Sequence, residues 1–166
     1  MITIISGTNR PGSNTHKVAS NYQRLFAEKG IKTNLLSLNE HDVCYKNEAF
    51  FALEKEYLIP TEKFIFILPE YNGSFPGIVK LMIDNSDVSR CWHNKKVLLT
   101  GVSSGRAGNL RGMEHFTGSL LHMKMIVHPN RLPISSVDKI FNEHAQIADA
   151  VTLEGIDKQI EEFIKF

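Results

Sequence analysis

Five short apolar runs recur along the chain, and each is followed by a loop rich in Gly, Ser, Asn or Pro. The runs are continuous rather than alternating, which is typical of strands covered on both faces in a parallel sheet. Segments with helical periodicity lie between them. Because consecutive parallel strands need a crossover, this order predicts an open, doubly wound α/β sheet whose ligand site lies beyond the carboxyl ends of its strands.

The expected elements alternate along the chain. Strands are predicted at residues 2–5, 34–38, 64–68, 97–102 and 124–127, and helices at residues 15–29, 48–58, 76–87, 109–121, 137–150 and 152–165. Gly30 is placed to end the first helix, since glycine readily adopts the left-handed conformation that closes many helices.

The composition limits the classes of function. At 166 residues, 42% of them hydrophobic, the chain is long enough for one domain, residues 1–166, and too short for two ordinary ones. A formal net charge of +1, from 19 basic and 18 acidic residues, leaves no basic field for nucleic acid or a membrane surface. No apolar run reaches the roughly 18 residues of a spanning helix, and no secretory leader is recognisable, so we expect a cytoplasmic location.

The cysteines and histidines give no sign of a disulfide framework or a metal site. Cys44 and Cys91 lie in unlike contexts without C-x-x-C spacing, which indicates plain thiols. His122 and His128 flank two methionines in a pattern more typical of strand or core packing than of ligands. We therefore expect no metal.

The loop after the first predicted strand, residues 6–15, reads S-G-T-N-R-P-G-S-N-T and leads into a helix. Such a loop brings unpaired backbone N–H groups and the positive end of a helix dipole to one point, which favours an anion. A terminal monophosphate would be suited by one cation, that of Arg10, and by several hydroxyls. The hydroxyls are those of Ser6, Thr8, Ser13 and Thr15. The alternative is an ordinary strand-to-helix turn, in which Gly permits the turn and Ser caps the helix.

Two other phosphate loops fit less well. Gly7 and Gly12 are spaced as in the nucleotide-triphosphate loop G-x-x-x-x-G-K-[ST], but Ser13 replaces the lysine that contacts the β- and γ-phosphates. The dinucleotide fingerprint G-x-G-x-x-G needs a further glycine that this loop lacks. A kinase and a Rossmann dinucleotide domain are therefore disfavoured.

The loop after the third predicted strand, residues 69–77, reads P-E-Y-N-G-S-F-P-G. Its Asn72-Gly73 step favours a tight turn with positive φ, and Pro69 and Pro76 stiffen its ends. The result is a rigid backbone edge, suited to presenting N–H and C=O groups to a flat heterocycle. The alternative is a simple strand-ending turn with a proline at the start of the next helix.

The loop after the fourth predicted strand, residues 101–109, is small and rich in glycine. Its backbone is able to lie close under a ring, and a flexible surface loop is an equal alternative. It also satisfies G-x-S-x-G, the nucleophile elbow of α/β-hydrolases, with Ser103 as nucleophile. That reading is disfavoured because the later acid and histidine candidates all fall within the helix predicted at 137–150, namely Asp138, His144 and Asp149.

Together the three loops resemble those of the NADPH-dependent FMN reductase family of flavodoxin-like proteins, which includes azoreductases, quinone reductases and chromate reductases. The marks are S-G-T-N-R-P-G-S-N-T, P-E-Y-N-G-S-F-P-G-I-V-K-L-M-I-D and G-V-S-S-G-R-A-G-N-L-R-G. The second is the most specific, since the family's loop reads P-E-Y-N-x-S-x-P-G-x-L-K-x-x-I-D. The resemblance covers most of the chain and implies a three-layer α/β/α sandwich with a five-stranded parallel sheet in the order 2-1-3-4-5.

The resemblance also implies which residues hold FMN. The phosphate is expected on the first loop, at Ser6, Thr8, Arg10, Ser13, Asn14 and Thr15. The isoalloxazine is expected along the second loop, at Pro69, Glu70, Tyr71, Asn72 and Gly73, with Ser103, Ser104 and Gly105 on its other edge. The chain departs from the family at Asn85, where Trp is usual, and at Asn109, which follows Gly108 where the family has Gly-Gly.

The implied reaction is hydride transfer from NADPH to bound FMN, then reduction of a quinone, an azo compound, a metal oxyanion or free flavin. No catalytic side chain is expected, because the flavin carries the chemistry. Arg106 and Arg111 are candidates for the 2′-phosphate of NADPH. The alternatives are a flavodoxin-like electron carrier, whose usual acidity the near-neutral charge does not match, and the less favoured serine hydrolase. Apolar residues on the helices at 76–87 and 109–121 predict a homodimer or a dimer of dimers.

Overall fold

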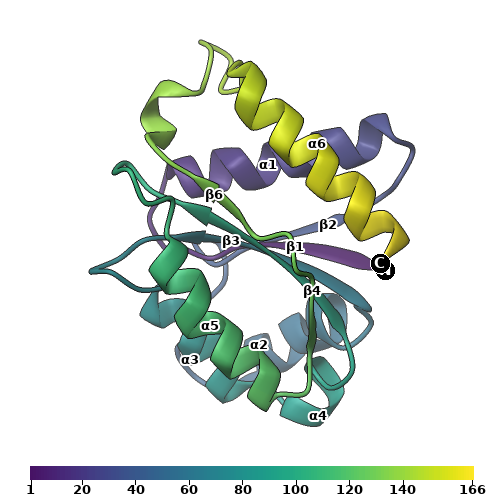
Figure 1. The fold of residues 1–166 in the computed structure, drawn as a ribbon. Helices are drawn as coiled ribbons and strands as arrows, with labels where there is room; N and C mark the ends of the chain where they lie inside the picture. The colour runs from purple at the N-terminus through teal and green to yellow at the C-terminus, as the bar shows by residue number, and fades with distance from the viewer.

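The computed structural model describes residues 1–166, which form three layers with a parallel sheet in the middle (Figure 1). The strands are β1 (Ile2–Ser6), β2 (Asn34–Ser37), β3 (Lys63–Pro69), β4 (Lys96–Val102), β5 (Ile126–Val127) and β6 (Leu132–Ile134). Their order is β2-β1-β3-β4-β5, with β6 also paired to β4. Every pair is parallel. The predicted fold class and strand order are confirmed.

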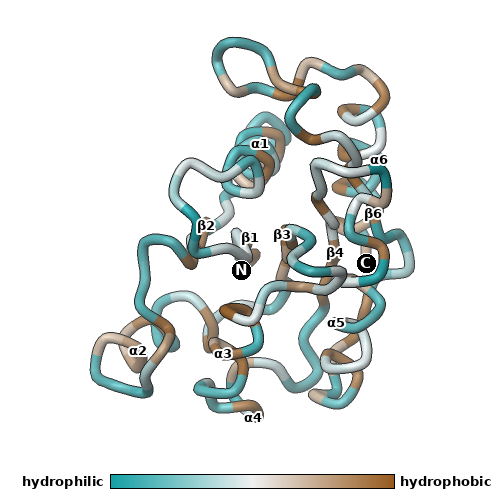
Figure 2. The backbone as a smooth tube through the Cα atoms, turned by 90° about the vertical axis from the view of Figure 1, so that its left-hand side faces the viewer, coloured by the Kyte–Doolittle hydropathy of each residue, from teal (hydrophilic) through white to brown (hydrophobic).

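Helices cover both faces of the sheet (Figure 2). One face carries α1 (Asn14–Glu28) and α6 (Ala150–Lys165), and the other carries α2 (Glu48–Leu53), α3 (Gly77–Asn85), α4 (Val88–Cys91) and α5 (Leu110–His122). A π-helical turn, η1 (Glu54–Leu58), continues α2, and a 3-10 turn, η2 (Val137–Lys139), follows β6. Five of the six predicted helices are therefore present, and the short α4 is an addition to them.

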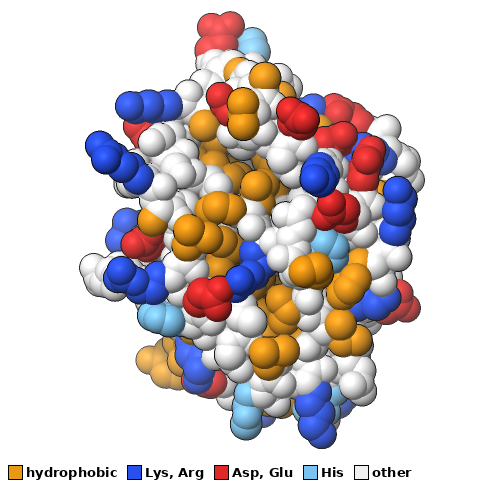
Figure 3. All heavy atoms as spheres, in the orientation of Figure 1, with side chains coloured by type: hydrophobic (Ala, Val, Ile, Leu, Met, Phe, Trp, Pro, Cys, Tyr) orange, Lys and Arg blue, Asp and Glu red, His pale blue; other side chains and the backbone are white.

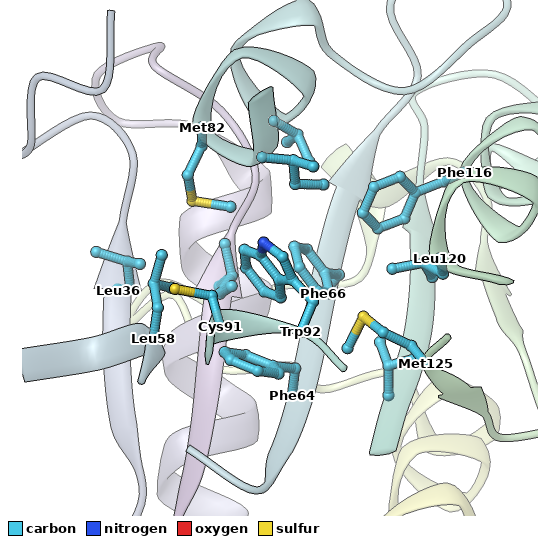
Figure 4. Packing of buried hydrophobic residues seen from close by; sticks show 14 of the residues in the cluster. Leu36, Leu58, Phe64, Phe66, Met82, Cys91, Trp92, Phe116, Leu120 and Met125 are labelled. Atoms are coloured by element: carbon cyan, nitrogen blue, oxygen red, sulfur yellow. The ribbon is translucent and has the colours of Figure 1, made fainter. Parts of the chain in front are cut away.

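The central strands bury side chains on both faces, which explains their continuous apolar runs. Phe64 and Phe66 of β3 pack on the side of α2 to α5, where the ring centroid of Trp92 lies 4.9 Å from that of Phe64 (Figure 4). Ile65 and Ile67, on the intervening positions, pack in the second core beneath α1 and α6. The alternation of faces along one strand thus supplies both cores.

The prediction of a helix at residues 137–150 is wrong. Only η2 forms, and the chain then makes a tight loop closed by pairing of Phe141 with Ile147. The Asn142 side-chain oxygen accepts hydrogen bonds from the amides of His144 and Gln146, at 3.0 Å each. Such side-chain bonds to nearby amides compete with the helical pattern.

The last predicted strand is divided into two. β5 pairs with the start of β4, and β6 pairs with its end. Lys124, the first residue of the predicted strand, has φ +58 and lies in the turn before β5. Pro133 interrupts the apolar pattern of β6, and it is tolerated there because this strand is at the edge of the sheet.

Both ends of the chain lie at the amino edge of the sheet (Figure 1). Lys63 Nζ donates to the carbonyls of Phe163 and Ile164, at 3.0 Å each, and Lys96 Nζ donates to that of Phe166. These bonds attach the last turn of α6 to β3 and β4. The three loops selected from the sequence emerge from the opposite edge.

Acidic and basic side chains are interspersed on the face shown in Figure 3, without a large field of one sign. This agrees with the formal net charge of +1. None of the helices combines the length and the apolar character required to span a bilayer.

Candidate functional site

Two adjoining cavities lie at the carboxyl edge of the sheet, with volumes of about 270 and 370 Å³. Both have Glu70, Ser103 and Ser104 in their walls, so they are two compartments of one cleft. The helix cavity, beside the start of α1, is completed by Arg10, Pro11, Ser13, Asn14, Thr15, Pro69, Tyr71, Val102 and Val137. The turn cavity is completed by Asn72, Gly73, Gly105, Arg106 and Ala107.

The first loop presents free backbone donors to the helix cavity. Ser13 caps α1, because its Oγ accepts a hydrogen bond of 3.1 Å from the amide of His16. Gly12 has φ +64, which turns the chain into the helix. Several amides of the loop donate no hydrogen bond within the protein, namely those of Asn9, Gly12, Ser13, Asn14 and Thr15. Free amides at a helix N-terminus suit a phosphate group.

Two of the predicted phosphate residues lie below the surface of the cleft. Ser6 is fully buried, and its Oγ has no hydrogen-bond partner. Thr8 is also buried, and its Oγ1 accepts a hydrogen bond of 3.1 Å from the amide of Arg10. Neither residue lines a cavity. Thr8 therefore shapes the loop from inside.

Tyr71 connects the second loop to the first. Its hydroxyl lies 2.5 Å from Thr8 Oγ1, and the guanidinium carbon of Arg10 lies 4.0 Å from its ring centroid. The resemblance placed Tyr71 along the isoalloxazine, but the structure places it in the helix cavity beside Arg10. Arg10 thus lies on an aromatic face at the mouth of that cavity, a favourable arrangement for a guanidinium.

The Asn72-Gly73 step forms the predicted tight turn. Tyr71 and Ser74 exchange both backbone hydrogen bonds, at 2.9 and 3.1 Å, and the two central residues have φ of +51 and +76. Positive φ at both positions is typical of a type I′ turn. The amides of Asn72 and Gly73 donate to no protein group. The turn therefore holds two free donors beside the turn cavity.

Ser103 holds the third loop together. Its hydroxyl donates to the carbonyl of Gly105 and accepts from the amide of Gly108, both at 2.9 Å. A serine nucleophile needs a base within hydrogen-bond reach, and no histidine is among its partners. The helix predicted at residues 137–150, which disfavoured a hydrolase, is absent. The two hydrogen bonds of Ser103 argue against a hydrolase independently.

Asn109 replaces the second glycine that the family usually has, and it does so in the left-handed conformation, with φ +60. Asparagine tolerates this region better than most residues. Its Nδ2 donates to the carbonyls of Leu68 and Pro69, at 2.9 Å each, so the third loop is fastened to the end of β3. A Cβ at Gly112 would lie 2.0 Å from its Oδ1, which explains the glycine there.

The two arginines proposed for NADPH lie in different places. Arg106 is exposed and lines the turn cavity. Arg111 lines neither cavity, and its Nη1 is 3.0 Å from the position a Cβ would take on Gly73. Arg111 therefore covers the Asn72-Gly73 turn from outside, and only Arg106 faces the cleft.

Several wall residues were not predicted from the sequence, namely Pro11, Val102, Ala107 and Val137. The first three adjoin or lie within the predicted loops. Val137 was assigned to a helix instead, and its amide donates to the carbonyl of Ser103 at 3.0 Å. No sequence signal indicated this contact, because it depends on β6 bringing the chain back beside β4.

The sequence model of the NADPH-dependent FMN reductase family matches residues 1–138. The chain belongs to this family. An NAD(P)H-dependent FMN reductase of Pseudomonas aeruginosa is 29% identical over 112 residues, and the match covers 64% of this chain and 60% of that protein. The resemblance drawn from the three loops is therefore confirmed.

Solved structures show the same fold. FerB of Paracoccus denitrificans, a flavoenzyme NAD(P)H:(acceptor) oxidoreductase, has a TM-score of 0.81 at 21% identity, over 99% of this chain and 94% of that one. The apo form of an NADH:FMN oxidoreductase, EMOB, has a TM-score of 0.75 at 17% identity, over 98% and 87%. The description of the family names FMN and NADPH, which are therefore the two ligands to test against the cleft.

The chain's own groups fit FMN. The helix cavity offers free amides and one guanidinium to a terminal phosphate. The turn cavity offers the amides of Asn72 and Gly73 to the polar edge of a ring. The two compartments adjoin, as one molecule with a phosphate at one end and a ring at the other requires.

Proposed function

We propose that this chain is an FMN-dependent NAD(P)H oxidoreductase that reduces a small acceptor. The observation that carries the proposal is the single two-compartment cleft, in which free amides lie both at the start of α1 and at the Asn72-Gly73 turn. Bound FMN accepts and passes on hydride equivalents, so the protein has to bind, orient and tune it.

The first loop anchors the cofactor. The free amides of residues 12–15 form the positive end of α1, which would face the phosphate. Arg10 would add a full positive charge that offsets the charge of the dianion. Tyr71 holds the guanidinium in place through the ring contact. Ser13, Asn14 and Thr15 line the same cavity.

The second and third loops hold the ring between them. Amides of Asn72 and Gly73 donate to its polar edge, which favours a reduced ring that carries more negative charge. Ser103, Ser104 and Gly105 form the opposite wall, and the hydroxyl of Ser103 maintains its shape. No side chain is assigned to acid–base catalysis.

The acceptor follows the dinucleotide in the same cleft. The turn cavity is open to solvent at the exposed residues Ser104 and Gly105, so small molecules of several classes can enter in turn. We propose quinones, azo compounds, metal oxyanions and free flavin as the acceptor classes. Alternating occupancy of one site predicts ping-pong kinetics.

The deciding experiment is to purify the protein, titrate it with FMN and follow oxidation of NADPH and NADH with each acceptor class. We expect bound flavin and acceptor-dependent turnover with parallel double-reciprocal lines. A flavodoxin-like carrier would bind FMN without oxidising either dinucleotide. A chain that binds no FMN would contradict the proposal altogether.

We also propose that the chain forms a homodimer or a dimer of dimers through α3 and α5. A hollow of about 780 Å³ lies between these helices, lined by Ile83, Val88 and Met123 among others, and Leu121 is exposed on α5. Light scattering at micromolar concentration should give at least twice the mass of one chain, and a monomer would refute the assembly.

We propose a cytoplasmic location. Cys44 and Cys91 are both free thiols, which supports a reducing compartment such as the cytoplasm.

A further inference from the structure

A third hollow, apart from the cleft, lies between α1 and the loop that replaces the predicted helix. Its volume is about 310 Å³, and it is lined by His16, Lys17, Ser20, Asn21, Arg24, His144, Ala145 and Gln146. No carboxylate lines it, and its one apolar side chain is that of an alanine. We call it the cationic cavity. A wall of this chemistry suits an anion with several oxygen acceptors.

Two side-chain nitrogens in this wall lack partners. His16 Nδ1 and Arg24 Nε are buried and form no hydrogen bond within the protein. An unpaired buried polar atom is unfavourable, and native proteins contain few of them. Both belong to residues of this wall, and because the protein covers them, their side chains would have to rotate before an entering group reached either atom.

The charges of the wall are only partly neutralised. Lys17 forms no ion pair, and its Nζ lies 5.5 Å from the ring centroid of Phe141. Arg24 pairs through Nη1 with Glu28 at 2.5 Å, and His144 lies 3.4 Å from Glu143. Neither glutamate lines the cavity. The cavity therefore presents one free ammonium, whereas the guanidinium of Arg24 is already bonded to Glu28 and, at 3.4 Å, to the side-chain oxygen of Asn21.

The cavity is preformed, because Asn21 clamps its two walls together. This buried side chain donates from Nδ2 to the carbonyls of Lys17 and Ala145, at 2.8 and 3.0 Å, and accepts from the amide of Ile147 at 3.1 Å. Ala145 has φ +57, a conformation that is costly for alanine and that the clamp maintains. Binding therefore requires little ordering of the loop.

We propose that the cationic cavity binds a phosphomonoester dianion, and that its source is the 2′-phosphate of NADPH. The same two segments wall both sites: Thr15 and Val137 line the helix cavity, and His16 and His144 line this one. A dinucleotide that approaches the cleft along α1 brings its phosphates past Lys17. The choice of NADPH rests on the proposed function, whereas the anion site itself does not.

The test is calorimetric titration of FMN-saturated protein with adenosine 2′,5′-bisphosphate and, separately, with inorganic phosphate. Saturation with FMN keeps the probes away from the first loop. The double variant Lys17→Gln/Arg24→Gln should weaken bisphosphate binding by at least about tenfold, as expected for charge-assisted bonds. It should raise the KM for NADPH, leave the KM for NADH unchanged, and leave FMN affinity unchanged.

The matched control is Lys32→Gln/Lys165→Gln, which removes two exposed charges outside the cavity and should leave all affinities unaltered. Binding of inorganic phosphate without the bisphosphate, lost in the Lys17→Gln/Arg24→Gln variant, would support the anion site and assign it to free phosphate. No binding of either probe, or weakening by Arg106→Gln in place of the cavity variant, would overturn the proposal. If the chain binds no FMN, the same titration in an Arg10→Ala background still tests the site.

Discussion

The guanidinium of Arg10 lies against the ring of Tyr71, whose hydroxyl is hydrogen-bonded to Thr8 at the base of the same loop. The two contacts join the loop after β1 to the loop after β3. A charge that is already held in position needs less ordering when its ligand arrives, so the stack suits the phosphate site proposed for this loop.

Arg10→Ala should weaken FMN binding by about 10- to 100-fold, since a charge-assisted bond of this kind contributes about 1.5–3 kcal/mol. The fold should be unaffected, because Arg10 is exposed. Fluorescence titration of apoprotein with FMN measures the change. The control is Arg90→Ala, which removes an exposed charge on α4. If the two variants bound FMN with equal affinity, Arg10 would not belong to the site.

Ser103→Ala should lower FMN affinity by about 0.5–1.5 kcal/mol, or about two- to tenfold, because two bonds within the third loop are lost. NADPH oxidation at saturating FMN should change little. A hydrolase would behave differently, since loss of its nucleophile removes activity by several orders of magnitude. Ester hydrolysis by flavin-free wild-type protein that disappears in Ser103→Ala would therefore contradict the reductase.

Tyr22→Phe should destabilise the fold by about 1–3 kcal/mol without altering FMN affinity. The Tyr22 hydroxyl is buried, where it lies 2.8 Å from Thr100 Oγ1 and donates to Gln159 Oε1 at 2.6 Å. Burial also raises the pKa of this phenol. Urea unfolding followed by circular dichroism provides the free energy, and Tyr45→Phe, at a position 71% exposed, should stay close to wild type. Equal stability of the two variants would show that the buried hydroxyl contributes nothing.

The sheet was predictable because its strands bury both faces, so runs such as residues 64–68 are apolar without interruption. The segment at 137–150 was not. Val137, Ile140 and Ile147 are all buried in one core, as a helical face would be, yet the local structure follows from Asn142 and from contacts with Asn21, far away along the chain. Residue spacing cannot report such distant partners.

The same division holds for the cleft. Its three loops and the Asn72-Gly73 turn follow from local chemistry, since Pro restricts φ while Gly and Asn permit positive φ wherever they occur. The direction of each side chain depends on tertiary packing. Ser6 and Thr8 face inward for that reason, and Tyr71 joins the helix cavity because Thr8 and Arg10 provide its partners.

Asp149→Ala should lower the unfolding temperature at neutral pH, because Asp149 caps α6. Its carboxylate accepts from the hydroxyl and the amide of Thr152, and these bonds lower its pKa below the ordinary 3.8. A depressed folded-state pKa provides stability above the unfolded value that is lost as the pH falls through the folded one. Thermal scans at pH 7 and at about pH 2 should show the difference between variant and wild type disappearing in acid. A difference of equal size at both pH values would exclude the charged cap.

Alkylation should distinguish the two thiols. Cys44 is exposed, whereas Cys91 is fully buried, and burial raises the pKa of its thiol to about 12. The thiolate is the reactive form, so iodoacetamide should modify one cysteine in native protein and both after denaturation. The neighbouring Asp42 side chain raises the pKa of the Cys44 thiol as well, so the labelling rate of Cys44 should rise with pH. Mass spectrometry identifies the site, and rapid native modification of Cys91 would show that α4 opens.

Both chain ends lie at the amino edge of the sheet, where lysines of β3 and β4 hold the last turn of α6 (Figure 1). The cleft is at the other edge. A linker joined to either end would therefore orient immobilised molecules on a bead or an electrode with their ligand-binding loops toward the solution. Small acceptors would then exchange as freely as with the untethered protein, and the same attachment point would serve for fusion to a second enzyme.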